Sequence, residues 1–158
     1  DAKNKIFLRY DEIENFVLAG KGLGVIIHEN RFTYRAKGLH KITDLGEYWE
    51  KKTNNPIPLG GIAVKRSVDH KISLQIDKLI RKSIEYAYKN YSHELTDYIK
   101  NNSQEMSEEI MRQHIDLYVN KYSIDLGEEG KNAVKKLLEV YQKLYGNVSV
   151  EKDIFIKE

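Results

Sequence analysis

The sequence predicts a mixed α/β chain in which strands and helices alternate up to about residue 57 and helices dominate afterwards. Three observations lead to this prediction. Residues 25–27 read Val-Ile-Ile, a continuous β-branched run typical of a strand buried on both faces. Pro56 and Pro58 lie in one stretch, which must be extended because proline fixes φ and restricts the residue before it. From Leu74 onward, apolar residues recur with helical spacing.

Composition also changes at residues 56–61, where the two prolines are followed by a pair of glycines. We place a lobe boundary there. Residues 1–57 are predicted to form a smaller α/β lobe, and residues 58–158 a mostly helical part of a larger lobe. The total of 158 residues permits one ordinary domain or pieces of two.

Two acidic pairs have the spacing of a capping box and predict helix starts. Asp11 and Glu14 begin a helix that is expected to stop at Gly20, and Asp44 and Glu47 begin a short helix. The periodicity and punctuation of the remaining sequence predict further elements. These are strands at 25–27, 39–43 and 62–64, helices from Leu74, Ser92, Ser107 and near Gly127, and a tail at 147–158 that could be a strand.

The overall composition is that of a globular protein, with 41% hydrophobic and 32% charged residues. The net charge is only +2, and basic residues alternate with acidic ones, so we expect no nucleic-acid partner. There is no cysteine for a disulfide or a thiolate metal site. No apolar run is long enough to span a bilayer and the first residues lack a secretory pattern, so we expect no membrane partner.

His28, which follows the predicted strand at 25–27, is the residue best suited to a catalytic role. In open α/β sheets the carboxyl end of a strand faces the crevice where ligands bind. An imidazole there suits proton transfer at neutral pH, so His28 is our candidate catalytic base. A hydrogen-bonded structural histidine would fit the same position.

Five further residues are candidates for substrate binding. Glu29 could orient His28 or bind a hydroxyl, although a carboxylate at a loop start is more often solvated or caps a helix. Arg31 could pair with a carboxylate, although an exposed arginine usually binds only water. Leu59, Gly60 and Gly61 could bring backbone amides close to a ligand, or could simply make a tight entry into a strand.

The other histidines, His40, His70, His93 and His114, lack the spacing of a metal site, and we expect them to be surface or core residues without a metal ligand role. The chain also lacks a GxxxxGK[ST] loop, a GxGxxG fingerprint and a GxSxG turn. Kinase, dehydrogenase and serine hydrolase functions therefore lose support.

Three ordered blocks carry a family resemblance: GVIIHENRFTY at 24–34, DLGEYWEKKTNNPIPLGGIAV at 44–64 and HIDLYVNKYSIDLGEEG at 114–130. Together, over about residues 5–145, they resemble the 1,4-dihydroxy-6-naphthoate synthase family. The resemblance implies the two-lobed, periplasmic-binding-protein-like (type II) fold. It also implies that this chain is the carboxy-terminal portion, lacking most of the amino-terminal lobe, which would then be a partner.

The resemblance implies a cytoplasmic lyase that converts cyclic dehypoxanthine futalosine to 1,4-dihydroxy-6-naphthoate in menaquinone biosynthesis, without a cofactor or metal. By motif match, His28 is the general base. We expect this chain alone to be inactive. A non-enzymatic solute-binding protein of the same fold is the alternative, and a homodimer assembled through the helices is compatible with the sequence.

Overall fold

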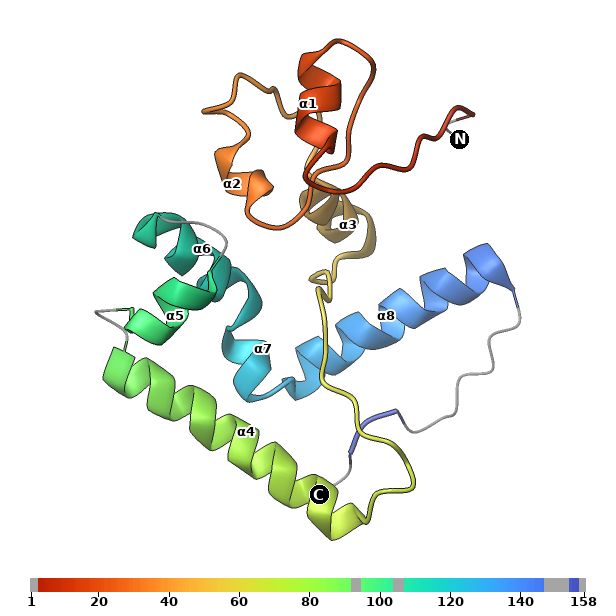
Figure 1. Cartoon of the computed structure of the whole chain (residues 1–158). Coiled ribbons are helices and arrows are strands. Elements are labelled where there is room, and N and C mark those ends of the chain that lie inside the picture. Colours follow the sequence, from red (N-terminus) through yellow and green to blue (C-terminus); the bar gives the residue numbers. More distant parts are fainter. Residues whose placement is uncertain (1–2, 92–94, 104–106, 147–153, 157–158) are drawn as a thin grey trace.

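The computed structural model of the chain describes residues 3–91, 95–103, 107–146 and 154–156. Figure 1 shows α1 to α3 grouped at one end and the segment at 54–69 leading from them to α4 and the later helices. Within the described ranges the helices are α1 (Ile13–Leu18), α2 (Asn30–Thr33), α3 (Leu45–Thr53), α4 (His70–Tyr91), α5 (Asp97–Asn102), α6 (Glu108–Tyr118), α7 (Lys121–Ile124) and α8 (Gly127–Tyr145).

The predicted start of α3 is confirmed, with Asp44 as its cap. The Oδ1 atom of Asp44 accepts hydrogen bonds from the backbone N–H groups of Gly46 and Glu47, at 2.9 and 3.2 Å. These groups have no partner inside the helix, so the aspartate stabilises its first turn. The helix ends at Asn54, which adopts the left-handed conformation with φ of 53°.

The helix predicted after Asp11 is present as α1, but Asp11 does not cap it. The side chain of Arg9 donates hydrogen bonds to both carboxylate oxygens of Asp11, at 3.1 and 2.8 Å. Glu12 occupies the capping position instead, without a side-chain bond to the helix. As predicted, the helix stops before Gly20, whose φ of 70° favours glycine.

The later helices follow the predicted periodicity. α4 begins earlier than Leu74 because Asp69 Oδ1 accepts from the N–H groups of Lys71 and Ile72. α6 follows Ser107 and α8 starts at Gly127, both as predicted. The start predicted at Ser92 lies outside the described residues, as does most of the tail at 147–158.

The short helices α2 and α7 were not predicted from sequence. Each has only a single turn, too short for an apolar period to appear. Asn120 starts α7 with a reciprocal capping box: its Oδ1 accepts from the N–H of Tyr122 at 3.0 Å, and the Ser123 hydroxyl accepts from its N–H at 3.1 Å.

The strands predicted at 25–27, 39–43 and 62–64 are wrong for the part of the chain that the structure describes, which holds no strand. A strand needs a neighbouring chain segment to complete its hydrogen-bond ladder. These segments are extended or irregular without one, and their apolar side chains are largely uncovered. Val25 is 63% exposed, Ile42 77% and Ile62 80%.

The core is small. Among described residues the buried apolar side chains are Tyr34, Leu95, Met111 and Ala133. The chain has an accessible surface of 13062 Å², whereas a compact monomer of 18.5 kDa is expected to expose about 8,200 Å². Much apolar surface is therefore uncovered.

Helix α4 illustrates this exposure. It packs against α7, and near its end the hydroxyl of Tyr88 donates to the backbone carbonyl of Val119. Its other face carries Ile72, Ile76 and Leu79, which share one stripe at helical spacing and are 49%, 42% and 65% exposed. Among the described residues, no helix combines the length and apolar character that a membrane span requires.

Candidate functional site

An open pocket of about 540 Å³ brings three separate parts of the chain together. The first part is the amino-terminal segment with the turn before α2, the second is α5 with its carboxyl end, and the third is one face of α6. The lining combines apolar residues with hydroxyl, amide, carboxylate and imidazole groups. The lining residues are Tyr10, His28, Glu29, Tyr98, Ile99, Asn102, Ser103, Met111, His114 and Ile115.

His28 reaches this pocket because the chain folds back along α1. Gly24 has no side chain, and a Cβ atom there would collide with the methyl groups of Ile13 and Val17, so glycine permits the close approach. His28 then turns the chain with a φ of 56°, a left-handed conformation that is uncommon outside glycine. Its ring meets Tyr10 edge to face, with centroids 5.6 Å apart.

Glu29 faces His114 of α6 across the same pocket. Its Oε1 atom lies 3.6 Å from Nδ1 of His114, and the two side chains are 22% and 29% exposed. The His114 ring also stacks on Tyr118, with centroids 4.6 Å apart and planes tilted by 35°. The carboxylate therefore contacts a second histidine that sequence analysis had expected to be a surface or core residue.

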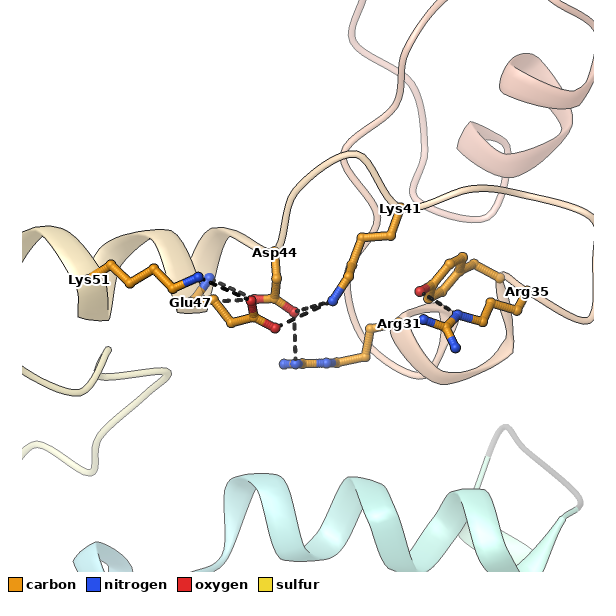
Figure 2. Close-up of polar contacts among 8 residues, drawn as sticks. Arg31, Arg35, Lys41, Asp44, Glu47 and Lys51 are labelled. Carbon is orange, nitrogen blue, oxygen red and sulfur yellow. Dashed lines mark hydrogen bonds and ion pairs between the residues drawn. The ribbon is translucent and has the colours of Figure 1, made fainter.

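Arg31 does not line the pocket and instead joins an ion-pair network at the start of α3 (Figure 2). Its Nη2 atom lies 3.4 Å from Oδ2 of Asp44. Lys41 approaches Glu47 at 3.4 Å and Asp44 at 4.0 Å, and Lys51 approaches Glu47 at 4.0 Å. In this structure the positive charge of Arg31 therefore offsets the negative charge of Asp44, the residue that caps α3.

The network has a clear electrostatic effect on Asp44. Desolvation by burial acts to raise the pKa of this carboxyl group, but the N–H groups of Glu47 and Gly46 and the charges of Arg31 and Lys41 outweigh it. The pKa lies below its ordinary value. Asp44 is therefore held ionised as a structural cap.

Leu59, Gly60 and Gly61 lie in the exposed segment between α3 and α4. They do not line the pocket, Leu59 is 46% exposed, and open space surrounds both glycines. Of the six predicted site residues, the structure brings His28 and Glu29 together and leaves the other four elsewhere.

Sequence reasoning missed the wall contributed by α5 and α6, including Tyr98, Asn102 and His114. These residues are distant from His28 in sequence, and no local pattern connects them. The available signal was that His114 opens the third block that carried the family resemblance. Among the described residues, no group of three or more metal-ligating side chains is close enough to hold a metal ion.

The arrangement is suited to proton transfer. His28 is exposed at the pocket wall, where an imidazole can take or give a proton. His114 supplies a second imidazole whose buried Nδ1 edge faces a carboxylate. Tyr98, Asn102 and the apolar side chains of α6 complete a wall that can hold a partly polar, ring-containing molecule.

Comparison with known proteins defines the class. The pattern of a family described as "Menaquinone biosynthesis" matches residues 1–143, and the chain belongs to this family. A relative from Thermus thermophilus named "1,4-dihydroxy-6-naphtoate synthase" is 41% identical over 131 residues, covering 82% of this chain and 48% of the relative. A Streptomyces coelicolor protein of the same name is 40% identical over 134 residues, covering 84% and 47%.

These matches confirm the resemblance predicted from the three sequence blocks. They also show that the chain spans about half the length of the curated relatives it matches.

Proposed function

We propose that this chain forms one part of a lyase that converts cyclic dehypoxanthine futalosine to 1,4-dihydroxy-6-naphthoate, with His28 as the general base. The observation that carries the proposal is the position of His28 on the wall of the pocket, in a chain that belongs to the menaquinone biosynthesis family. The name that both relatives carry supports the product. A cytoplasmic location belongs to the same proposal.

The proposed reaction begins when His28 removes a proton from carbon. The electron pair of that C–H bond forms a ring double bond, and the bond to the ribose-derived fragment breaks. Aromatisation of the product drives the step, so the protein needs to supply a base, orientation and exclusion of water. In this proposal no cofactor takes part, as the sequence resemblance implies.

We further propose that residues 1–57 and 58–158 belong to the two lobes of a periplasmic-binding-protein-like fold. The rest of the protein would cover the stripe formed by Ile72, Ile76 and Leu79 and would supply the opposite wall of the site. Two facts support this: the chain aligns with about half of each relative, and its accessible surface far exceeds that of a compact monomer. The uncovered β-branched segments would then find strand partners there.

The first experiment is to assay this chain alone and mixed with, or fused to, the half of the Thermus thermophilus relative that it does not match. We expect 1,4-dihydroxy-6-naphthoate from the assembled protein and none from the chain alone. Self-association of the chain without any gain from the added half would point to a homodimer and contradict the two-lobe proposal.

The second experiment replaces His28 with Asn in the assembled protein. Asparagine tolerates the left-handed conformation of this position and lacks an imidazole, so it isolates the loss of the base from a loss of fold. We expect turnover to fall by about 100-fold or more, while His70→Gln, at an exposed position, leaves it unchanged. Near-normal turnover in His28→Asn would overturn the base assignment, and tight substrate binding without turnover by the unaltered assembly would favour a solute-binding protein.

A further inference from the structure

The second histidine of the pocket has an unusual environment. Nδ1 of His114 is fully buried and makes no hydrogen bond to any described residue. The Glu29 carboxylate lies 3.6 Å from this nitrogen. A buried imidazole nitrogen without a partner is costly, so a small inward shift of either side chain would gain a charge-assisted hydrogen bond.

Other charged groups on α6 and nearby have other neighbours: Glu109 accepts from Gln113 at 3.4 Å, and the exposed Asp116 lies close enough to Tyr88 to affect its pKa. Arg112 binds Glu108 at 2.8 Å, and Lys100 approaches the same carboxylate at 3.6 Å. Arg31 faces Asp44. Apart from His28, the remaining pocket residues are uncharged tyrosine, amide, hydroxyl and apolar groups. Glu29 is therefore the carboxylate placed to act on His114.

A carboxylate that accepts from one imidazole nitrogen fixes the tautomer and leaves the other nitrogen for chemistry. With Nδ1–H directed at Glu29, Nε2 is the nitrogen of His114 that remains for chemistry, and His114 lines the same pocket as His28. The stack on Tyr118 restricts rotation of the same ring. The pocket thus holds two imidazoles in different environments, one at a left-handed turn and one whose Nδ1 atom faces a carboxylate at 3.6 Å.

We propose that His114 is the general acid of this site and that Glu29 is its positioning residue. The inference rests on the proposed function. His28 takes the proton from carbon, the C–H electron pair enters the ring, and the bond to the departing fragment breaks with its electrons going to the departing atom. Nε2 of protonated His114 gives that atom a proton. One proton is taken and one is given, so the step is balanced, and proton exchange with water through the open pocket returns His28 to its neutral form and His114 to its protonated form.

The first test does not depend on turnover. Ring ¹⁵N chemical shifts of the chain report which nitrogen of each neutral histidine carries the proton. We expect His114 to be Nδ1-protonated, and Glu29→Leu, which removes the acceptor, to shift His114 toward the Nε2-protonated form while His28 keeps its spectrum. An unchanged His114 tautomer in Glu29→Leu would overturn the positioning role.

The second test uses the assembled protein. His114→Gln is expected to lower kcat by about 100-fold with little change in KM, and to remove the alkaline limb of the pH–rate profile. His114→Asn serves as a second variant if the first fails to fold, and His70→Gln is the control. Turnover within about twofold of the unaltered protein would overturn the acid role, whereas absence of turnover in the unaltered assembly would instead refute the proposed function.

Discussion

Nζ of Lys37 lies 2.6 Å from Oε2 of Glu14, a carboxylate whose side chain is only 8% exposed. The ion pair ties α1 to the turn that follows α2. Since the other oxygen of Glu14 is buried without a hydrogen-bond partner among the described residues, Lys37 is the main compensation for burying this charge.

We therefore expect Lys37→Met to lower the free energy of unfolding by about 1–3 kcal/mol, because it leaves a buried carboxylate without its cation. Lys21→Met, an exposed lysine in the turn after α1, is the matched control and should change stability by less than about 0.5 kcal/mol. Urea unfolding followed by circular dichroism measures both. If the double variant Glu14→Gln/Lys37→Met is no more stable than the sum of the single changes predicts, the pair is not coupled.

Replacing Asp44 separates its two roles. Asp44→Ala removes the cap of α3 and should cost about 1 kcal/mol, whereas Asp44→Asn keeps a capping side chain and loses only the attraction to Arg31 and Lys41. Unfolding free energies at neutral pH should rank the native chain first, Asp44→Asn second and Asp44→Ala last. An equal loss in both variants would show that charge, rather than capping, dominates.

The same residue gives a pH dependence. The pKa of Asp44 is lower in the folded chain than its ordinary value of 3.8, so the unfolded state binds the extra proton first. Its contribution is complete above about pH 4 and is lost as the pH falls through the lower, folded pKa. The stability difference between the native chain and Asp44→Asn should shrink to near zero in that acidic range, and a constant difference would contradict this account.

Glu139 on α8 predicts a second acid-sensitive element. Hydrogen bonds from Lys143 and Lys136 hold the pKa of Glu139 at about 2, below its ordinary 4.5. The pKa of Glu139 is lower in the folded chain than in the unfolded chain. The ion pairs of Glu139 with Lys136 and Lys143 therefore stabilise α8 above pH 4.5, and this stabilisation is lost as the pH falls from 4.5 to about 2. Glu139→Gln should reduce helicity at neutral pH, less so in high salt, and match the native chain near pH 2. A salt-insensitive difference would speak against ion pairing.

The backbone at His28 makes a prediction about stability alone. With φ of 56°, His28→Gly should be nearly neutral, whereas His28→Val should cost about 1–2 kcal/mol because a β-branched residue is strained there. Asn54, with φ of 53°, offers the matched position at the end of α3. If valine is tolerated at 28 but not at 54, the left-handed turn at His28 is not maintained in solution.

Local signals in the sequence predicted local structure well. The spacing of Asp44 and Glu47 gave the start of α3 because capping depends on neighbours within one turn. The same spacing failed at Asp11, since Arg9 competes for the carboxylate. The strand predictions failed because β-branched residues report suitability for a sheet, while a strand also needs a partner segment.

The site was predicted only in part for a similar reason. His28 and Glu29 adjoin an apolar run, a local feature that sequence reasoning can find. His114 reaches the same pocket through the packing of α6 and has no local feature that marks it. The guanidinium group of Arg31 is suited to binding a carboxylate ligand, but in the folded chain it pairs with Asp44 instead. This ion pair depends on tertiary structure, so the sequence around Arg31 does not predict it.

The open surface of this chain, 13062 Å², has a calorimetric consequence. The heat capacity of unfolding measures apolar area that becomes newly hydrated, and a globular protein of this length would show about 2 kcal/mol/K. Ile72, Ile76, Leu79 and similar side chains already meet water in the folded chain, so they add little to that change. Thermal unfolding of the chain by itself should therefore be shallow, with a free energy of unfolding that curves weakly with temperature. Under the two-lobe proposal, the remaining heat-capacity change should be measured when the proposed other half binds.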